Sequence, residues 1–144
     1  MRIQIPHFFF TVLSKILNIS EAATIAIHSM ALIARSKELL NAQEIAKITG
    51  FSKNHISKVL QQLVKYHFLI STRGPKGGFV LKHNPEEVSL MEIYRAIDGE
   101  IEKGTNCKMH CDNCPFNSCI FGGLSQKFSR EFSEYLTTKN LATV

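Results

Sequence analysis

The four cysteines of the chain lie close together, at a spacing that could hold a metal ion or an iron–sulfur cluster. They are Cys107, Cys111, Cys114 and Cys119, in the pattern C-x3-C-x2-C-x4-C. Soft thiolate donors match the iron of iron–sulfur clusters, and a short loop can wrap them around one. Spacings of two to four residues are equally typical of structural zinc, held by four thiolates or by three thiolates and an imidazole. The pattern therefore predicts a metal-binding loop and leaves zinc and iron–sulfur open.

Two other uses of these thiols are alternatives. They could form a switch that oxidises to disulfides, or they could be spectators at a site that has been lost. The chain has no other cysteine with which they could pair, and its first residues do not have the pattern of a signal peptide. Free thiols suit the reducing cytoplasm, where we expect the protein to be.

Residues 42–81 have the pattern of a winged helix-turn-helix. Asn41 is suited to cap a short helix, because Glu44 follows three residues later and completes a capping box. That helix is expected to stop at Gly50, and Ser52 then caps a longer second helix. The apolar residues of the second helix share one face and are Ile56, Val59, Leu60, Leu63 and Val64. A short helix, a tight glycine turn and a longer helix predict a helix-turn-helix.

The segment after the second helix predicts the wing. Residues 68–73 and 79–81 favour β-strands, and they flank the glycine-rich residues 74–78. Because glycines permit a positive φ at a tip, we expect a hairpin here. Arg73 and Lys76 add two cations to it, and Arg73 is suited to the minor groove of DNA.

The polar face of the second helix carries residue types that read DNA bases. These residues are Lys53, Asn54, Ser57, Lys58 and Gln61. Asn54 is suited to adenine, Lys58 to guanine, and Ser57 to either base. Lys53 is expected on phosphate. An ordinary solvated helix face is the alternative, but the wing, the net charge of +5 and the pI of about 9.1 favour double-stranded DNA as the partner.

Two more helices are expected to flank this unit. Ser20 is suited to cap a helix that extends to about Ser36. Ser89 and Glu92 form another capping box, which opens a helix that ends at Asp98–Gly99.

A last helix is expected from about Phe121 to Leu136. Its apolar residues form a narrow stripe of Leu124, Phe128, Phe132 and Tyr135 or Leu136. A narrow stripe on a long terminal helix often packs on its twin, which predicts a homodimer. Packing against its own domain is the alternative.

The composition indicates one domain with an appended arm. A chain of 144 residues with 44% hydrophobic residues can build a core. Residues 1–18 are expected to be an N-terminal extension, whose apolar run at residues 7–13 is too short to cross a membrane. The other expected divisions are a winged helix-turn-helix DNA-binding domain at 19–100, a cysteine-rich loop at 101–120 and a dimerisation helix with its tail at 121–144.

Several stretches together carry a family resemblance. They are Lys58-Val59-Leu60-Gln61-Gln62-Leu63, Arg73-Gly74-Pro75-Lys76-Gly77-Gly78-Phe79, Ala96-Ile97-Asp98-Gly99 and the cysteines that follow. From about Ile19 to Leu141 the chain resembles the IscR-like family of bacterial transcriptional regulators, which includes NsrR and RirA. The resemblance implies a homodimeric winged-helix repressor or activator. It also implies, as in many members, an iron–sulfur cluster that reports iron–sulfur status, iron, nitric oxide or redox state.

The resemblance also implies a ligand set. Three cysteines ligate the cluster in such regulators, and Cys107 and Cys119 preserve the outer span. Cys111 and Cys114 flank the position of the single central cysteine, so either one is a candidate for it. The simplest interpretation is that the other supplies the fourth ligand.

Histidines are the alternative source of the fourth ligand. Some members have a histidine where this chain has Gly122, and others use an acid and a histidine of the first helix. Thr24 stands at the position of that acid, and His28 stands at the position of that histidine. His28 and His110 are therefore alternative ligands, although a histidine on a mostly apolar helix is more often a hydrogen-bonded core residue.

We therefore predict a mainly α fold with a small β-hairpin, a winged helix-turn-helix followed by a long C-terminal dimerisation helix. The predicted function is a dimeric cytoplasmic regulator that binds a pseudo-palindromic DNA operator, has no membrane partner and senses its signal through a 2Fe-2S or 4Fe-4S cluster. A regulator with structural zinc or a thiol switch is the alternative. An electron carrier or metalloenzyme is disfavoured, because the chain has no nucleotide-binding glycine loop and no nucleophile motif.

Overall fold

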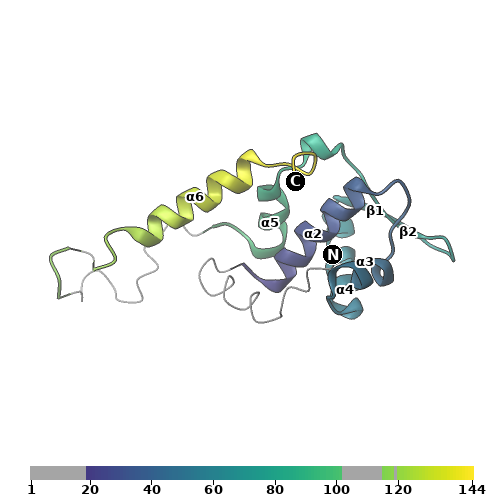
Figure 1. Ribbon diagram of the computed structural model, residues 1–144, viewed down its shortest axis with the longest axis horizontal. Coiled ribbons are helices and arrows are strands. Elements are labelled where there is room, and N and C mark those ends of the chain that lie inside the picture. The colour runs from purple at the N-terminus through teal and green to yellow at the C-terminus, as the bar shows by residue number, and fades with distance from the viewer. Residues whose placement is uncertain (1–18, 102–114, 119) are drawn as a thin grey trace, which may run out of the picture.

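The computed structural model describes residues 19–101, 115–118 and 120–144 (Figure 1). Its helices are α2 (Glu21–Arg35), α3 (Ala42–Thr49), α4 (Lys53–Lys65), the 3-10 helix η1 (Pro85–Glu87), α5 (Leu90–Asp98) and α6 (Leu124–Thr138). Strands β1 (Leu69–Thr72) and β2 (Gly78–Leu81) pair antiparallel. This order confirms the predicted mainly α fold with a small hairpin. No helix in the described part of the chain is long and apolar enough to cross a membrane.

Helix α2 is the centre of the core. It packs against α4, α5 and β2, so it carries an almost continuous apolar face. The buried residues of that face are Ala23, Ile25, Ala26, Met30 and Ile33, each at most 5% exposed. The predicted cap is confirmed, because the Ser20 hydroxyl accepts a hydrogen bond from the backbone N–H of Ala23 at 2.9 Å.

The helix-turn-helix forms as its local signals predict. The Asn41 side chain accepts from the N–H groups of Gln43 and Glu44, and Glu44 accepts from the N–H of Asn41. Helix α3 then stops at Gly50, whose φ of 78° lies in the left-handed region. Ser52 begins α4 by accepting from the N–H of His55 at 3.4 Å.

The wing is built around glycines with two different roles. Gly74 has a φ of 113°, as expected of a tip. Gly77 and Gly78 do not take a positive φ; they are needed because a side chain would not fit. A Cβ on Gly77 would lie 2.2 Å from the carbonyl oxygen of Thr72, and one on Gly78 would lie 2.8 Å from the backbone of Leu40. The close approach at Gly78 lets the neighbouring Phe79 donate its N–H to the Leu40 carbonyl at 2.9 Å.

The capping box of α5 is also confirmed, with Ser89 and Glu92 bonded reciprocally. The predicted start of the last helix is wrong by three residues, because α6 begins at Leu124 and not at Phe121. Gly122 and Gly123 both have a positive φ, which an α-helix cannot include. In Figure 1, α6 extends away from the other helices, and the hairpin projects on the opposite side.

Candidate nucleic-acid interface

Helix α4 separates an apolar face from a polar face. Its buried residues are Ile56, Val59, Leu60 and Leu63, each at most 2% exposed. The predicted DNA-reading residues lie on the other side, where Lys53, Asn54, Lys58 and Gln61 are exposed and Ser57 is half-buried. The apolar spacing fixes the rotation of the helix, and the rotation fixes which residues face solvent.

The polar face of α4 is open to a partner. None of its five candidate side chains makes a hydrogen bond or ion pair with another residue in the described part of the chain. The first turn of α4 carries no acidic residue of its own, and Lys53 adds a cation there. Polar and cationic side chains that have no partner within the described chain suit an anionic ligand such as a DNA phosphate.

The wing is fixed to the far end of α4. The backbone N–H of Phe68 donates to the Leu63 carbonyl at 3.0 Å, and the N–H of Lys82 donates to the Phe68 carbonyl at 3.0 Å. These two bonds hold both strands at the end of α4. Arg73 directly follows β1, Lys76 lies in the turn, and both side chains are exposed. The hairpin that carries Arg73 and Lys76 is therefore joined directly to the end of α4.

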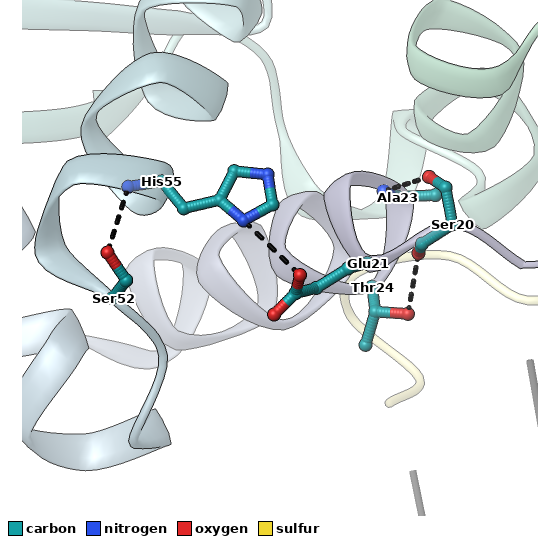
Figure 2. A network of polar contacts seen from close by, with 6 residues as sticks. All are labelled: Ser20, Glu21, Ala23, Thr24, Ser52 and His55. Carbon is teal, nitrogen blue, oxygen red and sulfur yellow. Dashed lines mark hydrogen bonds and ion pairs between the residues drawn. The ribbon is translucent and has the colours of Figure 1, made fainter. Parts of the chain in front are cut away.

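One contact at α4 was not predicted from the sequence. The Nδ1 atom of His55, in the first turn of α4, lies 3.5 Å from a carboxylate oxygen of Glu21 in the first turn of α2 (Figure 2). No local pattern reveals this pair, because the two residues meet only when α2 and α4 pack together.

Most of the predicted metal ligands lie outside the described residues. This applies to all four cysteines and to His110. His28 is described; it is exposed, and its Nδ1 lies 2.8 Å from the carbonyl oxygen of Thr24. If Nδ1 donates in this bond, Nε2 is left as the acceptor that faces away. Among the described residues, no three His, Cys, Asp or Glu side chains form a group that could hold a metal ion.

The predicted dimerisation stripe on α6 divides into two parts. Phe132 packs on its own domain, where its ring meets that of Tyr94 edge to face at 5.5 Å between centroids. Leu124, Phe128 and Tyr135 are 47%, 42% and 54% exposed. Phe132 therefore packs inward, which was the alternative expected for the stripe, whereas Leu124, Phe128 and Tyr135 are open to solvent.

Comparisons of the sequence identify the family. A family model named Rrf2 and described as an iron-dependent transcriptional regulator matches residues 19–144. The chain is 32% identical over 104 residues to the transcriptional regulator NsrR of Bacillus licheniformis, which covers 70% of this chain and 69% of that protein. It is 27% identical over 101 residues to IscR of Sodalis glossinidius, covering 69% of this chain and 59% of that protein.

Solved structures share the fold. CymR, the global cysteine regulator of B. subtilis, superposes with a TM-score of 0.69 at 20% identity, over 87% of this chain and 93% of that chain. IscR of T. potens superposes with a TM-score of 0.65 at 20% identity, over 87% of this chain and 83% of that chain. The chain therefore belongs to the Rrf2 family, which is a family of DNA-binding transcriptional regulators and not of enzymes.

Proposed function

We propose that the protein is a cytoplasmic, homodimeric regulator that reads a pseudo-palindromic operator with α4 and the wing. We further propose that a cysteine-ligated iron–sulfur cluster changes its affinity for that operator. The observation that carries the DNA-reading part is the polar face of α4, whose candidate side chains make no hydrogen bond or ion pair within the described chain. Family membership supports the same assignment.

The proposed roles of the DNA-reading residues follow from their chemistry. Asn54 and Lys58 would read base edges, since an amide matches adenine and an ammonium matches guanine. Ser57 and Gln61, beside them on the helix, would add hydrogen bonds to bases or backbone. Lys53, Arg73 and Lys76 would neutralise phosphates or enter the minor groove.

The proposed dimer follows from α6. Three large side chains of its stripe are about half exposed, and an apolar partner surface would cover them. A twofold-related copy of the same stripe is such a surface, and a symmetric dimer needs a self-complementary patch. Two copies would place two recognition helices on one duplex, about 34 Å apart for successive major grooves.

The cluster is proposed from the chemistry of its donors. Four thiolates form a soft ligand set, which suits an iron–sulfur cluster. Cys107 and Cys119 would be the outer ligands, Cys111 and Cys114 would complete the set, and His28 or His110 would substitute for one of them. Bound there, the cluster would supply a redox- and ligand-sensitive group. The NsrR and IscR relatives, together with the family description as iron-dependent, support this choice.

Zinc is the second candidate for the same cysteines, because their spacings of two to four residues also suit a structural zinc site. The fold alone does not identify the signal that the protein senses, since CymR, the global cysteine regulator of B. subtilis, has the same fold. The test is the visible absorption spectrum of protein purified without oxygen, with analysis of iron, sulfide and zinc. Brown protein with iron matched by sulfide is the expected result. Colourless protein with stoichiometric zinc would show that the cysteines hold a structural zinc ion and not a sensing cluster.

A further inference from the structure

The C-terminal end of α5 is tied to the first turn of α2. Asp98, the last residue of α5, accepts from the backbone N–H of Ser20 at 3.1 Å through one carboxylate oxygen. Its other oxygen accepts from the Ser20 hydroxyl. The two residues are 78 positions apart in sequence, so this carboxylate joins helices that only the fold brings together.

Ser20 passes this contact into α2. Its hydroxyl donates to Asp98 and accepts from the N–H of Ala23, so one oxygen atom both caps α2 and joins it to α5. The Ser20 carbonyl accepts from the hydroxyl of Thr24 at 3.0 Å (Figure 2). A shift of the first turn of α2 against α5 would therefore break the bonds between Ser20 and Asp98, which use the same hydroxyl that caps α2.

The next residue, Glu21, continues the connection to α4. Its carboxylate faces His55 at 3.5 Å, and the N–H of His55 is itself the group that Ser52 caps (Figure 2). Glu21 thus meets the recognition helix in the same turn as Lys53 and Asn54, two of the proposed DNA contacts.

Asp98 is also near the contact between α5 and α6. Tyr94 is one turn before Asp98 on α5, and its ring packs on Phe132 of α6. Burial raises the pKa of Tyr94, and the Asp98 carboxylate raises it further. A single carboxylate therefore lies beside the α5–α6 contact and bonds to the helix that contacts α4.

We propose that Ser20 and Glu21 are positioning residues that couple the end of α5 to the recognition helix and so set the DNA affinity of α4. The inference rests on the proposed function, because it takes α4 as the helix that reads DNA. The first cysteine, Cys107, follows Asp98 by nine residues in the sequence, and Phe132 of α6 packs on Tyr94, one turn before Asp98. A change at either place would reach α4 through Asp98, Ser20, Glu21 and His55.

The test compares affinities for two duplexes. One is a duplex of about 30 base pairs that the protein itself enriches from a random pool, long enough for two half-sites. The other is a scrambled duplex of the same composition. Fluorescence anisotropy on full-length protein purified without oxygen gives both affinities, and their ratio measures specific recognition. Glu100→Gln is the matched control. Glu100 lies just after the end of α5, and its carboxylate pairs with Arg95 of α5 and not with α2.

Glu21→Gln is expected to weaken binding to the enriched duplex about threefold to fivefold, since the contact with His55 is partly exposed and partly exposed polar pairs contribute little. Binding to the scrambled duplex is expected to hold or tighten, because the substitution removes a negative charge. His55→Leu should weaken binding to the enriched duplex to the same extent, and the double variant Glu21→Gln/His55→Leu should lose no more affinity for that duplex than either single variant. His55→Gln keeps a donor for Glu21 and should recover most of the ratio.

Equal changes on both duplexes, or additive losses in the double variant, would overturn the coupling. Asp98→Leu should lower the ratio of the two affinities as Glu21→Gln does. If the Asp98→Leu protein does not fold, Asp98→Asn replaces it. Asn keeps one acceptor for Ser20, so Asp98→Asn should lower the ratio less. An unchanged ratio in the folded variant contradicts the proposal. Asn54→Ala distinguishes failure of the proposed DNA-reading role of α4 from failure of the coupling. If it leaves the ratio unchanged, α4 is not the reading helix; if it lowers the ratio while Glu21→Gln does not, the coupling alone fails.

Discussion

Helices α4 and α6 are both amphipathic, but they complete their packing differently. The apolar stripe of α4 packs within its own domain, with Val64 at its end partly buried and the rest fully buried, and the outer face of the helix is polar. In the stripe of α6, Leu136 is 4% exposed and Phe132 packs on Tyr94, whereas Leu124, Phe128 and Tyr135 remain open. The two helices therefore present different surfaces to solvent. Helix α4 exposes polar donors and leaves no apolar stripe to be covered, whereas α6 exposes apolar side chains that a second copy would cover.

The greatest effect is expected from a core substitution in α4. Comparing its effect on the free energy of unfolding with that of an exposed substitution in α6 tests the difference between the two helices. Leu60 is fully buried and Leu124 is 47% exposed. Leu60→Ala should lower the free energy of unfolding by about 3 kcal/mol, because it leaves a cavity in the core. Leu124→Ala should lower it far less in dilute protein, where the monomer dominates. Urea unfolding at low concentration measures both, and equal losses would mean that the exposed part of α6 packs within the monomer.

A charge on the open part of α6 should break the proposed dimer. Phe128→Glu places a carboxylate in the apolar stripe, and sedimentation should show monomers. Affinity for the enriched duplex should fall on the order of 100-fold, since linked half-site binding is lost. Gln126→Glu adds the same charge at an exposed position off the stripe and should leave dimer and affinity unchanged. A dimeric Phe128→Glu protein would exclude this surface as the interface.

Substitutions on the polar face of α4 should change the specificity of DNA binding and leave the dimer intact. Asn54→Ala removes an amide suited to adenine, with an expected loss of about tenfold on the enriched duplex. The scrambled duplex should be bound almost as before, and sedimentation should still show a dimer. Anisotropy titrations on both duplexes measure this, and an equal loss on both would assign Asn54 to the phosphate backbone.

The wing should respond least. Arg73→Ala should weaken both duplexes a few-fold and lower the salt dependence of log affinity by about one unit, since one phosphate contact is lost. Titrations at several salt concentrations give the slope. An unchanged slope would place Arg73 away from the DNA backbone. Lys37→Ala, an exposed cation outside α4 and the wing, is the matched control.

Local signals in the sequence were sufficient for most of the fold. Ser20, Asn41, Ser52 and Ser89 each cap the helix that was predicted to follow, because capping depends on residues within one turn. The start of α6 was missed because Gly122 takes a backbone conformation that composition alone does not reveal.

The candidate site was predictable only where it is local. The polar face of α4 follows from the spacing of its apolar residues, so Asn54 and Lys58 were found in solvent as expected. The contacts of Glu21 with His55 and of Ser20 with Asp98 join distant segments, and no periodicity encodes them. The role of Gly78, whose missing side chain admits Leu40, is likewise set by tertiary contact.

The group held by the cysteines is proposed to set how tightly α4 and the wing bind DNA. Affinity for the enriched duplex should therefore be measured with protein purified without oxygen, before and after its iron is removed by a chelator. We expect a change of about tenfold or more, within the usual range of coupling between two sites. The Cys107→Ala protein should behave like the stripped protein before any treatment. Equal affinity with and without iron, in a protein that holds iron and sulfide, would contradict the proposed role of the cluster.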